Sequence, residues 1–194
     1  MSTLVEIGIY VVQTLGSLYL LVVLLRFLLQ IARADFYNPV SQAIVKLTNP
    51  LLIPLRKIVP GVFGIDLASL VLALLVEIVI FQIIYLMLGG IIPPVTVITW
   101  ALLGCVNLML NIFFFGLLIS IIFSWIAPYS RHPMLLLLNQ LMEPALAPFR
   151  RLIPPLGGLD ITPIFAFLVI NVLQMVVNGL ASSARMPSIF LPGL

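Results

Sequence analysis

Charged side chains are scarce in this sequence. Asp, Glu, Lys and Arg make up 8% of the 194 residues, whereas 63% of the residues are hydrophobic. A soluble domain usually carries about 25% charged residues, which keep its surface hydrated. Because this chain cannot cover itself in that way, lipid must be its main solvent. The low charge therefore excludes an ordinary soluble domain and predicts an all-α membrane protein.

Histidine and cysteine are almost missing as well, with one residue of each, His132 and Cys105. A single cysteine cannot form a disulfide within the chain. A single histidine cannot supply bis-histidine haem ligation or a histidine metal cluster. The sequence also has no glycine-rich phosphate-binding motif and no recognisable nucleophile–base pair. We therefore predict that the protein is not an enzyme and holds no cofactor or metal.

Four apolar runs are long enough to cross a membrane, which takes about 20 helical residues. They cover approximately residues 4–31, 66–88, 96–127 and 160–181. The first run is too long for the core of a signal peptide, so we expect it to be retained. Gly89-Gly90 and Pro93-Pro94 predict a short turn between the second and third runs.

Basic residues are concentrated in two of the three connections. The connection of residues 32–65 contains four of them and that of residues 128–159 contains three, whereas the C-terminal tail has only Arg185. The positive-inside rule predicts that both basic connections are cytoplasmic and that both termini lie outside. Anionic lipid headgroups are the expected partners of these loops, and direct nucleic acid binding is not expected.

The second half of the chain repeats the first at an offset of 94 residues. Residues 39–66 align without gaps with residues 133–160. The identical pairs include prolines, a glycine, Arg56 with Arg150 and Asp66 with Asp160, which a chance match of apolar residues would not bring into register. We therefore predict two tandem helix–loop–helix repeats, residues 1–94 and 95–194. Two spans in each repeat give both the same, parallel orientation in the membrane.

Each basic loop contains a polar residue followed by proline, a pattern typical of a helix N-cap with proline in the first turn. The four sites are Asn38-Pro39, Asn49-Pro50, His132-Pro133 and Glu143-Pro144. Between such sites we predict short helices, for example residues 40–48, with mixed apolar and polar faces. These helices are too short to span and are expected to lie in the membrane interface.

Longer motifs in the two loops carry a family resemblance. They are Asp35-Phe-Tyr-Asn-Pro39, Asn49-Pro-Leu-Leu-Ile-Pro-Leu-Arg-Lys57, Pro60 with Gly64-Ile-Asp66, Glu143-Pro-Ala-Leu-Ala-Pro-Phe-Arg-Arg151 and Gly157-Gly-Leu-Asp160. The paired motifs resemble the YggT family, also called YlmG, of bacterial inner-membrane and plastid proteins. The resemblance implies a small bacterial inner-membrane protein without established enzymatic activity. It also implies roles such as assembly or distribution of membrane complexes, division and nucleoid organisation, haem attachment in plastid cytochromes, or osmotic and potassium homeostasis.

One carboxylate, Glu77, lies inside a predicted span. It follows Asp66 by 11 residues, about 16 Å along a helix, which places it near the midplane, where charge is costly. Other polar residues lie at matching depths in the two repeats: Asn171, Gln13, Asn107, Ser17 and Asn111. We interpret them as a polar seam inside the bundle. Glu77 is then either a proton or cation site or a neutral group hydrogen-bonded between helices.

Two further features in the spans have alternative interpretations. Arg26 lies near the inner end of the first span and is expected to snorkel to the interface rather than to pair with Glu77. Gly116, Ser120 and Ser124 are spaced by four, a pattern that lets helices approach closely. We favour packing within the chain for this stripe, with a homodimer face as the alternative.

The charges that the two repeats share lie at the ends of the loops. Asp66 and Asp160 precede spans and are expected to cap helices, and a docking charge for a partner is a compatible role. The basic pairs Arg56-Lys57 and Arg150-Arg151 are expected at headgroup level, where they either contact lipid and set topology or dock a partner.

These observations favour a non-enzymatic membrane adaptor or assembly factor. Its paired basic, amphipathic loops would dock an unidentified membrane-protein partner or anionic lipids. The expected contact residues are Arg56, Lys57, Arg150, Arg151, Asp66 and Asp160. The alternative is a small transporter or channel component for monovalent cations that uses Glu77, for which a homo-oligomer would supply the pore.

Overall fold

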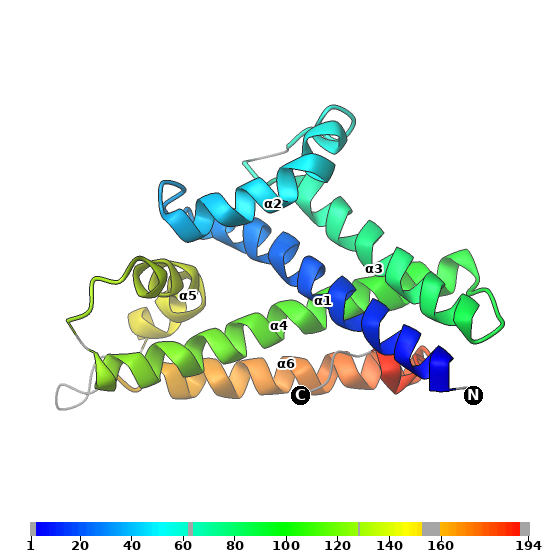
Figure 1. Ribbon diagram of the computed structural model, residues 1–194. Coiled ribbons are helices and arrows are strands. Elements are labelled where there is room, and N and C mark those ends of the chain that lie inside the picture. Colours follow the sequence, from blue (N-terminus) through cyan, green and yellow to red (C-terminus); the bar gives the residue numbers. More distant parts are fainter. Residues whose placement is uncertain (1–2, 62–63, 128, 153–159, 191–194) are drawn as a thin grey trace.

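The computed structural model describes residues 3–61, 64–127, 129–152 and 160–190, and its regular elements in these ranges are all helices (Figure 1). They are α1 (Thr3–Ile31), α2 (Pro39–Arg56), α3 (Leu67–Met87), α4 (Pro94–Ile126), α5 (Pro133–Leu152), α6 (Thr162–Ser183) and the 3₁₀ turn η1 (Ser188–Phe190). Four of them, α1, α3, α4 and α6, are long and apolar enough to cross a membrane. The all-α architecture with four spans is therefore confirmed.

The four long helices form two pairs that cross. α1 packs on α3, α4 packs on α6, and contacts between α3 and α4 join the pairs (Figure 1). α2 and α5 contact each other at one end of the bundle, and the start of α1 and the turn between α3 and α4 lie at the other. The loops of both repeats are thus on the same side, as parallel repeats require.

Aromatic side chains close the bundle at the end that contains the start of α1. The ring of Phe190 lies 4.6 Å from that of Phe81 and 5.6 Å from that of Trp100, measured between centroids. The indole nitrogen of Trp100 also donates to the carbonyl of Ala184 at 3.0 Å. The segment after α6 is therefore packed back between α3 and α4, and it forms part of the core.

Two of the predicted helix starts are confirmed. The Oδ1 of Asn38 accepts from the amide of Val40 at 2.9 Å, and Pro39 is the first residue of α2. The Nδ1 of His132 accepts from the amide of Met134 at 3.3 Å in the same way, at the start of α5. A side-chain acceptor followed by proline therefore begins the amphipathic helix of each repeat.

The other two predicted starts are wrong. Asn49-Pro50 and Glu143-Pro144 lie inside continuous helices, since α2 has 18 residues and α5 has 20. The four internal prolines, Pro50, Pro54, Pro144 and Pro148, are all exposed. Each pair is spaced by four residues and so lies on one helix face, where the carbonyls left without an amide donor face outward. The helices therefore continue past the prolines.

The length of α2 and α5 differs from the prediction of short helices, and it would nearly suffice for a span. Their amphipathic character is what separates them from the four candidate spans. In α2, Ile44 and Leu52 are buried against the bundle, whereas Leu47 and Leu51 are more than half exposed. Such helices are suited to the boundary between headgroups and acyl chains.

Candidate functional site

Each basic pair is divided between two tasks. The guanidinium of Arg56 forms an ion pair with Asp66, and it joins the end of α2 to the start of α3. Lys57, the next residue, is exposed, and no ion pair involves it within the described ranges. One member of the pair therefore holds the repeat together and the other is free for an external contact.

The second repeat divides its pair in the same way. Arg150 donates to Glu143 within α5 at 2.6 Å and to Asp160 at 3.3 Å, and it thereby links α5 to the segment that leads into α6. Arg151 is exposed and forms no ion pair with a described residue. The two members of each basic pair are adjacent and alike in charge, but in the fold one forms ion pairs and the other is exposed.

Asp66 is buried, with 5% of its surface exposed. Its carboxylate accepts from Arg56 and from the hydroxyl of Ser69 at 2.6 Å, and it makes no side-chain capping bond to a backbone amide of α3. Burial alone would raise the pKa of Asp66, but the hydrogen bonds from Arg56 and Ser69 outweigh it and hold the pKa below its usual value. Asp66 occupies the predicted N-cap position, yet its bonds are internal ties that leave it little surface for a partner.

Asp160 behaves as a more conventional cap. Its Oδ1 accepts from the amide of Thr162 at 2.9 Å and from the hydroxyl of the same residue. These hydrogen bonds from Thr162 lower the pKa of Asp160, and Arg150 contributes in the same direction. Its side chain is 46% exposed. The two aspartates therefore hold equivalent positions in the repeat with different burial.

This difference predicts unequal costs of neutralising the two aspartates. Asp66→Asn is expected to lower the free energy of unfolding at pH 7 by about 1.5 kcal/mol, because a buried acceptor of charged hydrogen bonds is lost. Asp160→Asn is expected to cost less than about 1 kcal/mol, since exposed ion pairs contribute little. Unfolding in mixed micelles provides the measurement. Equal costs for the two variants would contradict this account.

The effect of Asp66 is also expected to depend on pH. A carboxyl whose folded pKa lies below its unfolded pKa stabilises the fold above the unfolded pKa of about 3.9, and the contribution is lost as the pH falls through the folded pKa. The stability difference between the wild type and Asp66→Asn should therefore shrink as the pH is lowered from 7 towards 3. A difference that persists unchanged to pH 3 would exclude the ion pair as its source.

Arg26 does not snorkel to the surface as predicted. It is 5% exposed, and its Nη1 donates to Val45 O at 3.1 Å, to Thr48 Oγ1 at 2.5 Å and to Asn49 Oδ1 at 2.8 Å. All three acceptors belong to α2. Because the predicted interfacial helix folds over the end of α1, it provides the polar surroundings that the sequence-based prediction assigned to the headgroup region.

Glu77 lies inside the bundle as predicted, with 3% of its surface exposed. A cavity of about 10 Å³ beside it is also lined by Gln13 and Ser17, and Gln13 donates to the carbonyl of Ile189 at 2.7 Å. A cavity of this volume holds about one water molecule. It is too small for a hydrated cation, so the ion pathway stays a prediction that this geometry does not favour.

The second-repeat counterpart of Glu77 is placed differently from the prediction. Asn171 is exposed and donates back to the carbonyl of Phe167 within α6. The interior polar contact of α6 is instead made by Gln174, whose Nε2 donates to Asn111 Oδ1 at 2.7 Å, and Asn107 is buried in α4. The reason is that α3 packs against both α1 and α4, whereas α6 packs chiefly on α4 and α5. The face of α6 that corresponds to Glu77 therefore lies on the outside.

The small-residue stripe of α4 packs within the chain. A Cβ added at Gly116 would lie 2.6 Å from the Cε of Met142 in α5, and the hydroxyl of Ser120 donates to Asn139 Oδ1 in α5 at 2.8 Å. These contacts agree with the packing interpretation of the stripe. A homo-oligomer stays a prediction.

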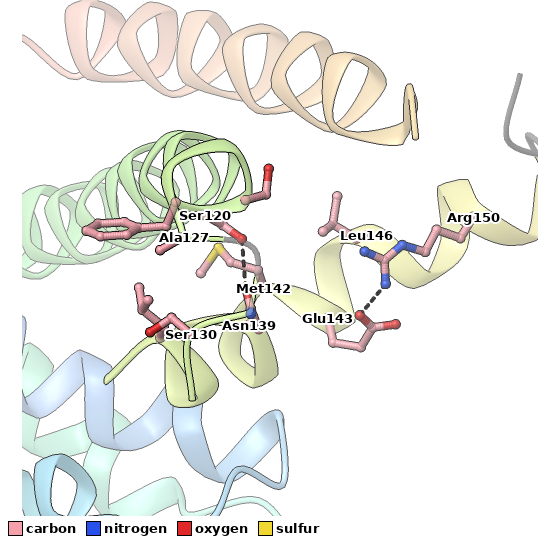
Figure 2. Close-up of a pocket in the computed structure, with 11 residues that line it drawn as sticks. Ser120, Ala127, Ser130, Asn139, Met142, Glu143, Leu146 and Arg150 are labelled. Carbon is pink, nitrogen blue, oxygen red and sulfur yellow. Dashed lines mark hydrogen bonds and ion pairs between the residues drawn. The ribbon is translucent and has the colours of Figure 1, made fainter. Parts of the chain in front are cut away.

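A pocket of about 410 Å³ lies between α4 and α5, and sequence analysis missed it (Figure 2). Its polar lining includes Ser120, Ser130, Asn139 and Glu143, and Arg150 contributes from the later part of α5. Figure 2 shows the ion pair between Glu143 and Arg150 along one side and the bond between Ser120 and Asn139 on the other. The 94-residue offset could have indicated it, because the offset pairs the short side chain of Ser120 with the long side chain of Arg26.

The fold and its loops define a multi-pass membrane protein built from two copies of a unit in which an amphipathic helix connects two spans. A family model described as CCB3/YggT matches residues 5–89 and 99–181, one segment for each copy. The chain therefore belongs to the CCB3/YggT family.

Relatives support this assignment along most of the chain. An uncharacterized protein of Pseudomonas aeruginosa is 54% identical over 192 residues, which cover 95% of this chain and 96% of the relative. The uncharacterized protein YggT of Escherichia coli strain K12 is 37% identical over 190 residues, 95% of each chain. The chloroplastic YlmG homolog protein 2 of Arabidopsis thaliana is 38% identical over 85 residues, 44% of this chain and 32% of the relative. No solved structure matches.

Proposed function

We propose that the protein is a non-enzymatic membrane adaptor that docks a partner membrane protein on the surface formed by α2 and α5. By the positive-inside rule this surface faces the cytoplasm of a bacterial cell, and both termini lie on the other side of the inner membrane. The resemblance of the loops to a family with relatives in membrane-complex assembly is consistent with this function.

The observation that carries the proposal is that the two loops are joined into one surface. The Nδ2 of Asn38 donates to the carbonyl of Pro133 at 2.7 Å, and the amide of Asp35 donates to Gln140 Oε1 at 2.9 Å. These bonds tie the start of α2 to α5, so that the amphipathic helices are held in a fixed relation. A fixed surface binds a partner at a lower entropic cost than two independent loops would.

The same surface combines exposed apolar and basic side chains. Tyr37, Leu47 and Ile58 are 89%, 60% and 79% exposed in the first repeat, and Lys57 lies beside Ile58. Leu152 is 79% exposed in the second repeat and follows the exposed Arg151. Apolar anchors next to positive charge suit a partner that presents a groove with acidic residues beside it.

Removing the two free basic residues is expected to release the partner without unfolding the protein. The variant Lys57→Gln with Arg151→Gln should lose a partner that co-purifies with the wild type in stoichiometric amount at native expression, by at least about tenfold, because steering and rim charges are removed. Quantitative mass spectrometry after mild solubilisation provides the measurement.

The matched control removes the same number of charges outside the two basic pairs, by Arg33→Gln at the start of the first loop with Arg185→Gln in the C-terminal tail, and should retain the partner. Accessibility of engineered tags in intact cells must show that both variants keep the wild-type orientation, because basic loops also set topology. A partner retained in the Lys57 and Arg151 variant, or no stoichiometric partner for the wild type, would contradict the adaptor function.

A further inference from the structure

The two repeats differ most where α1 and α4 meet their amphipathic helices. At the 94-residue offset, Ser120 of α4 corresponds to Arg26 of α1. Arg26 reaches the carbonyl of Val45 in α2, and Ser120 donates to Asn139 in α5, which is the counterpart of Val45. The same contact is therefore made by a long cationic side chain in one repeat and by a short neutral one in the other.

The pocket of about 410 Å³ lies beside this short side chain. In repeat 1 the guanidinium of Arg26 contacts Thr48 and Asn49. Their counterparts in repeat 2 are Met142 and Glu143, and both line the pocket. The pocket thus lies where the first repeat places its guanidinium. The amide acceptor Asn49 of the first repeat is replaced by the carboxylate of Glu143 in the second.

The charged side chains at matching positions of the two repeats differ in net charge, in the direction of a missing cation. Repeat 1 has Arg26, which bonds to α2, and the ion pair of Arg56 with Asp66, whereas in repeat 2 the carboxylates of Glu143 and Asp160 share one guanidinium, that of Arg150. These three side chains sum to +1 in the first repeat and −1 in the second. An ammonium group bound near Glu143 would restore the balance that Arg26 supplies in repeat 1.

An apolar cavity continues from this pocket towards the spans. It has a volume of about 380 Å³ and shares Ser120, Ser124, Leu146 and Arg150 with the pocket. Asp160 lines it beside Arg150, and its apolar lining includes Trp125 of α4 and Ile164 of α6. Trp125 and Ile164 are 81% and 65% exposed on the surface of candidate spans. A polar pocket at the level of an amphipathic helix, open to a lipid-facing apolar groove, has the layout of a headgroup next to its acyl chain.

We propose that this pocket binds the primary ammonium group of a membrane amphiphile, with the ethanolamine headgroup of a phospholipid as its source. The ammonium donates to Glu143 and Asn139, in the place that corresponds to the Arg26 guanidinium. Arg150, which keeps its contact with Asp160, meets the phosphate, and one acyl chain follows the groove past Trp125. This inference does not depend on the docking partner proposed above.

Native mass spectrometry of the purified protein tests the proposal. The protein is incubated with equimolar phosphatidylethanolamine, phosphatidylcholine and phosphatidylglycerol of identical acyl chains. The wild type is expected to retain phosphatidylethanolamine at least about tenfold over phosphatidylcholine, because a trimethylated headgroup has no N–H to donate. Equal retention of the two lipids, or a preference for phosphatidylglycerol, would overturn the proposal.

Two variants locate the site. Ser120→Arg gives repeat 2 the side chain that repeat 1 carries at this position, so it should fill the pocket and remove the preference. Glu143→Gln leaves the pocket open and should also remove the preference, which keeps the test decisive if the first variant folds poorly. Glu6→Gln at the other end of the bundle is the matched control for charge and should bind as the wild type does.

Free ethanolamine separates the two sources of the ammonium group. If it displaces the bound phosphatidylethanolamine only at a large excess, the lipid source is supported, because the acyl groove adds affinity. If free ethanolamine binds in a Glu143-dependent manner while no phosphatidylethanolamine is retained, the lipid source is overturned and a soluble amine takes its place. A preference that survives in both variants would place the lipid elsewhere and overturn the site.

Discussion

Gly104→Ala is expected to lower the free energy of unfolding by about 2 kcal/mol, as overpacking of a close-packed interior does. A Cβ at this position in α4 would overlap the carboxylate of Glu77 in α3 and lie 3.3 Å from the Cζ of Phe81. Glu77 and Phe81 are 3% and 2% exposed, and the space beside them is a cavity of about 10 Å³. The added methyl group therefore has to displace the Glu77 carboxylate into that cavity or push α3 and α4 apart.

The same substitution at an open position is expected to change the free energy of unfolding in the opposite direction. Alanine is a better helix former than glycine by about 1 kcal/mol, and Gly179 of α6 has no atom within 4 Å of the place a Cβ would occupy. Gly179→Ala should therefore be neutral or stabilising. The free energies of unfolding of the two variants are measured in the same mixed micelles. Gly179→Ala reports the effect of helix propensity, and its difference from Gly104→Ala reports the cost of overpacking between α3 and α4.

A second substitution tests whether Glu77 is the side chain in the way. Glu77→Asp shortens the side chain by one methylene, and combined with Gly104→Ala it should recover at least half of the lost stability. Such non-additivity is expected for residues in direct contact. Additive effects of the two changes would contradict the close approach, and a destabilising Gly179→Ala would show that the cost does not arise from this contact.

The parts of the fold that follow from local patterns could be predicted from the sequence. The four spans depend on the length and apolarity of continuous segments, and the observed helices agree with the predicted ranges within two residues at every end. The caps at Asn38 and His132 depend on adjacent residues only. The repeat was visible because prolines, arginines and aspartates keep a fixed offset, and the match of two segments to the family model agrees with it.

The predictions that were wrong concern residues whose environment is set by side chains from other helices. Arg26 is buried because α2 folds over it, and nothing within α1 specifies that contact. Asn171 is exposed because α6 lies at the periphery of the bundle and α3 lies at its centre. The sequences of the two repeats are alike and do not reveal this difference. Arg56 and Lys57 are adjacent and equally charged, yet only the first faces Asp66. Sequence periodicity gives the helix, while the neighbours decide the role of each side chain.

Thr48→Val is expected to cost about 2 kcal/mol, although it replaces one buried side chain with another of nearly the same shape. Thr48 is fully buried, and its hydroxyl accepts from Arg26 and donates to the carbonyl of Ile44 at 2.8 Å. A hydrogen bond to a charged group contributes about 1.5–3 kcal/mol. The Nη1 of Arg26 keeps Val45 O and Asn49 Oδ1 as acceptors after the change, so the expected cost is that of the one bond to Thr48 and of the Ile44 carbonyl left without its hydroxyl donor.

Thr48→Ser keeps the hydroxyl and separates this bond from packing. It is expected to cost less than Thr48→Val, although it removes a methyl group worth about 1 kcal/mol in a packed interior. Hydrogen exchange should show faster opening of α2 in the valine variant than in the serine variant, because the Arg26 contact is what holds α2 against α1 at this point. If the valine variant is as stable as the wild type and the serine variant is not, packing rather than the Arg26 bond fixes α2 on the bundle.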